Sequence, residues 1–402
     1  MMKKKPLLLG LLAFSFIACY SPDPFKADSS DDSDSSSESA VGKIYPVDGN
    51  KNESEQVCNP SVSNDTVNFP GSMLWLNFDE LKVKKHDDGY SLTDVAVHDR
   101  LTVSDTANNV VWYLMRDLSK GECQFQDPEW TTHADYIVAL RGYDIHGSKA
   151  CEDLDYGIFA VRTSDKEKFW FYEKGNVVDA APHVWVEPSA KADEDGDVKT
   201  VEGFFGTKNV RLTYVDGEGG AQEIVYVDYS KGSKSKAVRL EKPEGREDWK
   251  IDSPLISPDG KFVVYNMYEG VFSWEAYIQE LPTSTSSTKA IKIPRTKDMM
   301  SEPAQPHWFE WNGRLFVLWA EFPQGSQMLN TNNLTNPSVQ DGSVGRTVMR
   351  EIRLTAGAPA DLAAEWVGEN RVVATIPMTG GRSPDGAFLA TGTNNAYLLK
   401  LP

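Results

Sequence analysis

The stretch ISPDGKFVVY at residues 256–265 decides the fold of this chain, because it joins a tight turn directly to an apolar strand. Within its SPDG segment (257–260), proline presets φ for a turn and aspartate can bond its own backbone. Glycine then accepts a positive φ before the chain extends again. The run that follows is apolar on successive positions, as in a strand that is buried on both faces. The unit therefore predicts a turn leading into a buried β-strand.

The same unit recurs along the chain. SPDGAFLA at 383–390 repeats the turn and the strand, whereas FEWNGRLFVL at 309–318 keeps the turn glycine and the strand. WTTHADYIVA at 130–139 keeps the strand but lacks the Asp-Gly, and PHVW at 182–185 opens a fifth, weaker unit. Blades of a β-propeller need about 40–50 residues, so anchors spaced 55, 71, 53 and 73 residues apart fit blades with long loops. These anchors are Trp130, Trp185, Ile256, Phe309 and Arg382.

The rest of the chain from residue 70 onward predicts more strands. The runs at 109–115, 168–172 and 223–227 are rich in β-branched and aromatic residues and lie between clusters of Gly, Asp and Asn. Together with the repeated turn, they resemble the TolB-type, WD-like β-propeller repeat over roughly residues 125–402, with 70–120 as a further blade. The fold class that we expect is all-β.

The resemblance implies a propeller of six blades, with five or seven as alternatives. The chain has only two strands' worth of sequence after the last turn, at 383–386. We therefore expect N-terminal strands to complete the last blade and close the ring, because closure hides the sheet edges that an open array would expose.

The first residues have the layout of an export signal. Three lysines (3–5) precede an apolar run at 7–17, and then come Ala18 and Cys19. The run is too short to cross ~30 Å of hydrocarbon as a helix. Phe16-Ile17-Ala18-Cys19 resembles the bacterial lipobox, in which the cysteine is acylated and becomes the new N-terminus; the alternative is an ordinary signal with a chance cysteine.

These features divide the chain into three parts. Residues 1–18 are the expected signal peptide, and 19–56 are the lipidated cysteine with a disordered Ser/Asp-rich tether. Residues 57–402 are the expected propeller domain. Tyr20 follows the cysteine in place of an inner-membrane retention aspartate, so the resemblance implies an exported protein on the outer membrane, at its periplasmic face or at the cell surface. The chain is then expected to attach to the membrane through its N-terminal lipid.

The composition restricts the partners and the cofactors. A formal charge of −18 argues against nucleic acid as a partner. Four carboxylates lie within 193–197, and Asp193, Asp195 and Asp197 are the weak candidates for Ca²⁺. Their spacing misses the EF-hand register, so a solvated loop tip is the preferred interpretation. Neither a metal nor a cofactor is expected.

Three cysteines follow Cys19, namely Cys58, Cys123 and Cys151. Export would place them in an oxidising compartment, where a pair should close. We prefer a disulfide between Cys123 and Cys151, which flank one predicted blade, although Cys58 could pair with either.

Proteins that resemble TolB propellers mostly bind proteins or peptides at the mouth of the channel, without catalysis. His183 and Trp185 in one unit, and His307 and Trp308 in another, stand before inner strands and could form a ligand-facing rim, since each pairs an apolar body with a polar tip. The alternative is packing between blades. We expect a non-catalytic protein that binds a protein, peptide or glycan at its channel face.

The rival function is glycoside hydrolysis. Asp127, Asp252 and Glu302 loosely resemble, in chain order, the base, modulator and acid of five-bladed propeller glycosidases. That chemistry needs two carboxyl groups about 5–10 Å apart across a sugar. The sequence lacks the G-x-S-x-G motif of serine hydrolases.

Overall fold

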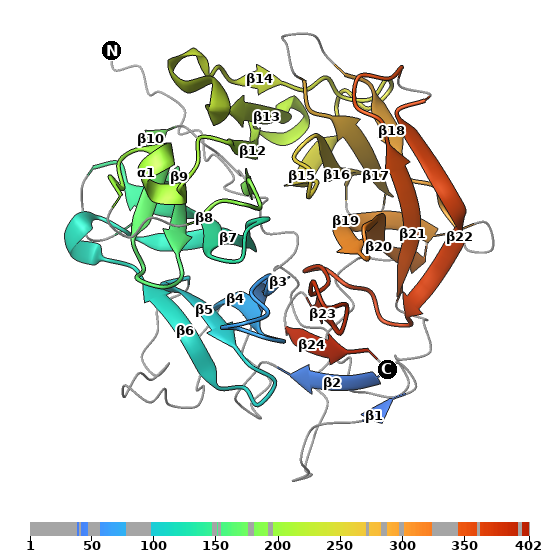
Figure 1. Cartoon of the computed structure of the whole chain (residues 1–402), viewed down its shortest axis with the longest axis horizontal. Helices are drawn as coiled ribbons and strands as arrows, with labels where there is room; N and C mark the ends of the chain where they lie inside the picture. Colours follow the sequence, from blue (N-terminus) through green and yellow to red (C-terminus); the bar gives the residue numbers. More distant parts are fainter. Residues whose placement is uncertain are drawn as a thin grey trace, which may run out of the picture.

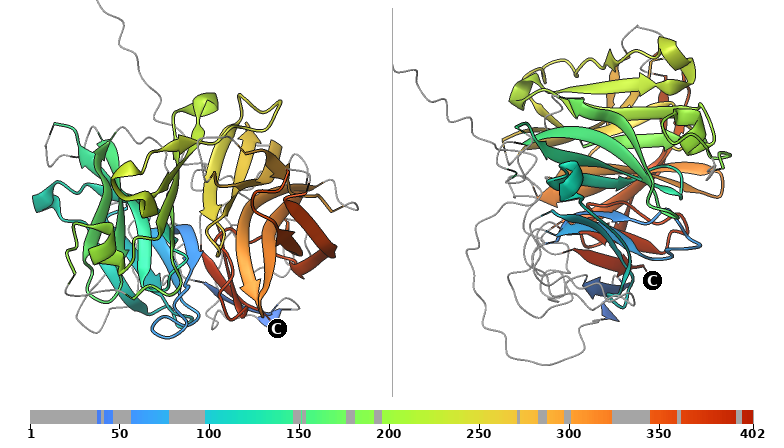
Figure 2. Two further views of the ribbon diagram at one scale, coloured as in Figure 1. Left: turned by 45° about the horizontal axis from the view of Figure 1, so that its top comes forward. Right: turned by 90° about the vertical axis from the view of Figure 1, so that its left-hand side faces the viewer.

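The chain forms a β-propeller of six blades, as the sequence predicts. A computed structural model describes residues 38–39, 42–46, 57–77, 98–146, 151, 154–175, 181–191, 196–270, 273–282, 288–296, 301–323, 345–359, 362–392 and 396–401. These residues build six antiparallel sheets of four strands each, placed around a common axis (Figure 1). The side views in Figure 2 show the sheets as twisted blades around this axis. The prediction of an all-β propeller with six blades is confirmed.

Blades 1 to 5 follow one another along the chain, and each starts with its innermost strand. Blade 1 consists of β3 (Val57–Val62), β4 (Met73–Asn77), β5 (Arg100–Ser104) and β6 (Val110–Met115). Blade 2 consists of β7 (Gln124–Trp130), β8 (Tyr136–Asp144), β9 (Leu154–Arg162) and β10 (Lys168–Gly175). Blade 3 consists of β11 (His183–Val186), β12 (Val210–Asp216), β13 (Glu223–Asp228) and β14 (Val238–Arg239).

The second half of the ring has the same plan. Blade 4 consists of β15 (Lys250–Ile256), β16 (Phe262–Glu269), β17 (Ser273–Glu280) and β18 (Ala290–Lys292). Blade 5 consists of β19 (Ser301–Trp311), β20 (Arg314–Pro323), β21 (Arg346–Leu354) and β22 (Ala364–Ala374). The described helices are short: α1 (Val201–Phe205) and the 3-10 turns η2 (Leu118–Lys120), η3 (Gly219–Ala221) and η4 (Tyr229–Lys234). Among the described residues, no helix has the length and apolar character needed to cross a membrane.

Blade 6 closes the ring with strands from both parts of the chain. Its inner strands are β23 (Phe388–Thr391) and β24 (Tyr397–Lys400), and its outer strands are β2 (Gly42–Pro46) and β1 (Glu38–Ser39). β2 runs antiparallel to β24, with Ile44 opposite Leu399. Closure by N-terminal strands is thus confirmed. One boundary needs correction: β1 and β2 lie inside 19–56, so part of the expected tether belongs to the propeller, because the last blade needs two more strands.

The repeated turn is built as its sequence predicts. The backbone N–H of Ser257 donates to the carbonyl of Phe262 at 2.8 Å, and Ser383 donates to Phe388 at 2.9 Å. Gly260 has φ 73°, a region that only glycine enters at low cost. The two SPDG segments therefore fold alike.

The degraded units keep the strand register with other turns. Thr131 donates to the carbonyl of Tyr136 at 3.1 Å, which reproduces the SPDG hydrogen bond without its Asp-Gly. In blade 5, β19 continues to Trp311, and Asn312 and Gly313, at φ 52° and 69°, connect it to β20. Asn-Gly is the preferred pair for such a two-residue hairpin, because both positions require a positive φ.

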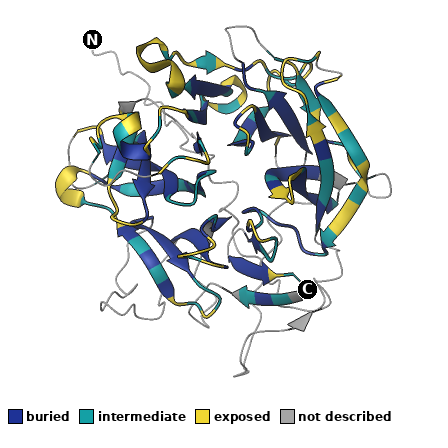
Figure 3. Cartoon of the chain, in the orientation of Figure 1, coloured by how far each residue is buried: buried dark blue, intermediate teal, exposed yellow. Residues whose placement is uncertain are grey.

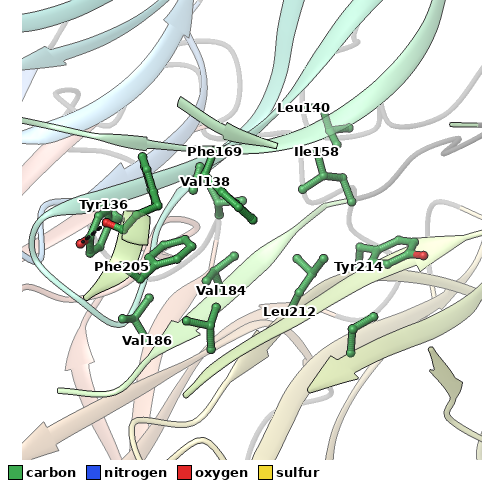
Figure 4. Packing of buried hydrophobic residues seen from close by; sticks show 14 of the residues in the cluster. Tyr136, Val138, Leu140, Ile158, Phe169, Val184, Val186, Phe205, Leu212 and Tyr214 are labelled. Carbon is green, nitrogen blue, oxygen red and sulfur yellow. Dashed lines mark hydrogen bonds between the residues drawn. The ribbon is translucent and has the colours of Figure 1, made fainter. Parts of the chain in front are cut away.

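The hydrophobic core is divided into layers between neighbouring blades, and Figure 3 shows the buried residues concentrated on the inner strands. Between blades 2 and 3, Tyr136, Phe169 and Phe205 pack with Val184 and Leu212 (Figure 4). Each large apolar side chain buried in this way contributes about 1.5–3 kcal/mol. Every blade therefore buries the apolar faces of its neighbours.

Two further contacts hold blade 2 in place. Cys123, which precedes β7, is joined by a disulfide bond to Cys151, which precedes β9, the pairing that the sequence analysis preferred. The helix α1 inserts Phe204 and Phe205 into the layer between blades 2 and 3. Thr200 caps α1 through its side chain, which accepts a hydrogen bond from the backbone N–H of Gly203.

Candidate binding site at the propeller axis

A cavity of about 420 Å³ lies on the axis and is lined by residues from all six blades. Blades 1 to 5 contribute Val62, Glu129, His183, Leu255 and His307, and blade 6 contributes the segment around 380–384. Residues of five inner strands and of the segment before β23 converge on one cavity, which makes this the candidate site.

A larger groove, of about 650 Å³, lies at the surface between blades 4 and 5. Its charged side chains include Arg314 and Glu351, which pair with each other. Arg314 is exposed, so this pair contributes little specificity. The axial cavity, in contrast, contains buried polar groups from several blades, and it is the better candidate despite its smaller volume.

The inner strands carry a repeated dipeptide that shapes the cavity. A residue followed by proline occurs at 59–60, 127–128, 181–182, 253–254 and 305–306, in or just before the innermost strands of blades 1 to 5; β19 has another copy at 302–303. The residue before the proline has a positive φ in four of them, namely Asp127 (45°), Ala181 (30°), Ser253 (51°) and Gln305 (48°). A non-glycine residue in this region costs energy, so the surrounding sheet must hold it in place.

The dipeptide also shifts the strand register. Pairing slips between Gln126 and Glu129 in β7, between Asp252 and Leu255 in β15, and between Ala304 and His307 in β19. Such a β-bulge re-aims the side chain that follows it. The residues that follow the prolines in blades 2 to 5 all line the cavity: Glu129, His183, Leu255 and His307.

His183 is held by a backbone contact from the next blade. Its Nδ1 accepts a hydrogen bond from the N–H of Ile256 at 2.9 Å, so the proton of the neutral ring is on Nε2. The side chain is 6% exposed. The pKa of His183 is lowered to about 3, mainly by burial and to a smaller extent by the nearby His307. His183 is neutral at physiological pH.

His307 has the opposite tautomer. Its Nδ1 lies 3.0 Å from the carbonyl oxygen of Gln305, so Nδ1 carries the proton and Nε2 keeps its lone pair. Burial lowers the pKa of His307 to about 4. Gly381 of blade 6 contacts this ring, and a Cβ at Gly381 would lie 2.9 Å from its Cδ2. A glycine is therefore required beside His307.

Glu129 is the third polar group of the cavity. The Ser61 hydroxyl, from blade 1, donates a hydrogen bond to its Oε1. Burial raises the pKa of Glu129 to about 8, although the hydrogen bonds from Ser61 and from the backbone of Trp130 oppose this shift. The carboxyl group is thus largely protonated at neutral pH.

The aromatic residues named from the sequence divide into two groups. Trp308 lines the cavity, and its Nε1 donates to the carbonyl of Leu255 at 2.9 Å. Trp185 does not line it: its ring packs against Gly260 of blade 4, and its Nε1 donates to the carbonyl of Pro258 at 2.7 Å. Trp185 therefore packs between blades, which was the alternative to a ligand-facing role.

Two of the three carboxylates of the rival function do not line this cavity. Asp127 and Asp252 are absent from its lining. Asp252 accepts a hydrogen bond from Gln305 Nε2 at 3.4 Å, and burial raises its pKa. Glu302 pairs with Phe322 in the β19–β20 ladder, and its side chain lies outside the described residues.

Several other predicted positions lie outside the described residues, namely Cys19, Asp193 and Asp195. Asp197 is described: it accepts a hydrogen bond from the N–H of Lys199 at 3.1 Å in the turn before α1. Among the described residues, no group of three His, Cys, Asp or Glu side chains could hold a metal ion.

Sequence reasoning missed Glu129 and Ser61 as parts of the site. Glu129 stands two residues after Asp127, and its chemistry depends on enclosure, which a sequence does not display. The repeated proline dipeptide could have revealed both residues, because each of them directly follows the proline of one copy.

Comparison with known proteins assigns this chain to no family. No known protein family and no curated protein matches the sequence. TolB from Acinetobacter baumannii is 14% identical, with a TM-score of 0.41, over 83% of this chain and 64% of that one, so this chain spans less than two thirds of its length. A putative TolB from Agrobacterium tumefaciens is 14% identical, with a TM-score of 0.41, over 89% and 97%.

A glycosidase structure is similar to the same degree. The alpha-L-arabinofuranosidase from Lactobacillus brevis is 10% identical, with a TM-score of 0.37, over 78% of this chain and 95% of that one. Likeness at this level transfers no activity in either direction. The class that fold and site define is a six-bladed β-propeller with a polar cavity on its axis.

Proposed function

We propose that this chain is a non-catalytic binding protein of the cell envelope, whose propeller takes a protein, peptide or glycan at its channel face. The observation that carries the proposal is the axial cavity, where His183, His307 and Glu129 converge from three blades beside the apolar Trp308. An enclosed site with apolar walls and a few fixed polar groups is the usual form of a binding pocket.

The envelope location rests on the first residues of the chain. The signal-like segment 1–18 and the lipobox-like cysteine at 19 support export and acylation. Two or more acyl chains on one residue anchor a protein stably, because each buried CH₂ contributes ~0.8 kcal/mol. Metabolic labelling with a radioactive fatty acid tests this: the full chain should incorporate label and Cys19→Ala should not. Equal labelling of both would contradict the anchor.

Photo-crosslinking in cells tests the binding site. A photoreactive amino acid would replace Asn64, which lines the cavity, or Val67, which is 83% exposed and does not line it. We expect an adduct from position 64 and none from 67. Sensitivity of the adduct to protease or to glycosidases identifies the ligand class. Adducts of equal yield from both positions, or from 67 alone, would refute a binding site at the cavity.

Glycoside hydrolysis remains the second candidate, because burial raises the pKa of Asp252, the expected modulator, and carboxyl groups with shifted pKa values are frequent at catalytic sites. The full chain should be assayed against chromogenic aryl glycosides, with Asp127→Asn, Asp252→Asn and Glu302→Gln as matched variants. Our proposal predicts no release above background. Release by the wild type that all three variants abolish would replace binding with catalysis.

A further inference from the structure

Three hydrogen-bonding groups deep in the axial cavity, His183, His307 and Glu129, are neutral, and this restricts what they can recognise. His183 and His307 are buried (6% and 7% exposed), and enclosure disfavours their protonated forms. Enclosure likewise keeps Glu129 protonated at neutral pH. A fully charged ligand would find no opposite charge among these three groups.

The arginine of the cavity is already engaged. Arg382 donates from Nε and Nη2 to the carbonyl of Gly386, at 3.0 and 2.7 Å, and its guanidinium lies 4.4 Å from the ring centre of Phe309. Its remaining Nη1 contacts the sulfur of Met349 at 3.5 Å. Burial also lowers the pKa of Arg382. This side chain therefore braces the turn of blade 6 and is not poised for an anionic ligand.

The two histidines offer complementary atoms. His183 has its proton on Nε2 and is a donor there, whereas His307 has a lone pair on Nε2 and is an acceptor. In the described part of the chain neither Nε2 has a hydrogen-bond partner, and neither is among the fully enclosed unpaired atoms. Since both rings line the cavity, we infer that both atoms can be reached from it.

A hydroxyl group satisfies both histidines, because it donates one hydrogen bond and accepts others. A carboxylate would accept from His183 but leave His307 unpaired, and an ammonium group would do the reverse. A ligand that leaves one of these buried polar groups unpaired loses binding free energy, and this loss makes the site selective. The donor and acceptor pattern therefore favours hydroxyl groups over either charged end of a peptide.

The walls and the size agree with a sugar. Trp308 and Leu255 supply apolar surface beside the polar groups, which suits a ligand with one C–H face and several hydroxyls. A volume of about 420 Å³ is within the ~300–1,000 Å³ range of small-ligand sites. Resting on the function proposed above, we propose that the cavity binds the neutral terminal unit of a glycan through hydroxyl groups held between His183 and His307.

The test uses the detergent-solubilised full chain on an array of neutral oligosaccharides, their uronic-acid counterparts and unmodified peptides. We expect neutral glycans to bind at least tenfold more tightly than the acidic counterparts. His183→Phe and His307→Phe should each weaken this binding at least tenfold. His146→Gln, an exposed change away from the cavity, should bind like the wild type. Near-UV circular dichroism checks that each variant is folded.

Four results would overturn the proposal. Binding of peptides without glycans would leave the binding function standing and refute the ligand class. Preferential binding of acidic glycans, or neutral binding that neither histidine variant weakens, would refute the role of the two rings. Absence of binding to every probe would remove both this inference and the channel-face function. The conservative His307→Asn, which keeps an acceptor, should restore part of the affinity lost in His307→Phe.

Discussion

Replacing Glu129 with glutamine should stabilise the protein in mildly alkaline solution. In the folded protein burial raises the pKa of Glu129 to about 8, against 4.5 for an unperturbed glutamate. A raised folded pKa means that the native state binds more protons than the unfolded chain between these values, so stability is lost as pH rises from 4.5 through 8. The shift corresponds to about 3 kcal/mol lost between pH 5 and pH 8, which contact with cavity water reduces toward about 2 kcal/mol.

Glutamine has the shape of a protonated glutamate and does not ionise, so Glu129→Gln should lack this loss. Urea unfolding at pH 5 and pH 8 measures it: the variant should gain about 2–3 kcal/mol on the wild type between the two conditions. Glu310→Gln, an exposed carboxyl change at the same cavity, is the matched control. If the unfolding free energies of the wild type and of Glu129→Gln depend on pH in the same way, Glu129 is ionised in the folded protein and its carboxyl group is not neutral in the cavity.

Three further predictions concern stability. His183→Asn should resist acid better than the wild type, by up to about 3 kcal/mol at pH 4 in urea unfolding, because a lowered folded pKa makes stability fall as pH decreases from 6.5 toward 3; an unchanged acid limb would contradict a buried neutral ring. Replacing Cys123 and Cys151 together by alanine should cost about 3–4 kcal/mol, since the disulfide closes a loop of 28 residues, and the same variant should become insensitive to reductant. Ile44→Ala should cost about 2–5 kcal/mol in thermal or chemical unfolding, because Ile44 is fully buried where the ring closes, whereas the neighbouring Lys43→Ala should change little; equal effects would mean that β2 does not close the ring.

The parts of the fold that could be predicted are those with strong local chemistry. The SPDG turns at 257 and 383 fix a turn and the start of a strand by themselves, so their recurrence revealed the blades. The intervals between units are uneven, at 53 to 73 residues, but each is long enough for one blade, so the sequence favoured six blades with five or seven as alternatives. The positions of β1 and β2 were missed because these strands are short and lie next to a polar run. They become strands only by pairing, β2 with β24 and β1 with β2. Tertiary context made that choice.

The candidate site was predictable in part for a similar reason. His183, His307 and Trp308 stood out because they repeat beside proline, and the structure brings them to one cavity. Trp185 also follows a Pro-His pair, but it stands one residue farther from the proline than Trp308 does. Its ring therefore packs between blades and does not line the cavity. Glu129 has no distinguishing neighbour in the sequence, since its raised pKa comes from enclosure by several blades at once.

The pairing of β2 with β24 sets the order in which the molecule can be completed. Ile44 and Leu399 face each other although 355 positions separate them along the chain. During synthesis, the first blades can stack as they emerge, but β2 cannot pair with β24 until the end of the chain has been made. The pairing of β2 with β24 is therefore a late folding step, and it must offset the entropy lost by closing a long loop. A chain cut before Tyr397 would keep five blades but leave two open flanks, each ready to pair with another molecule.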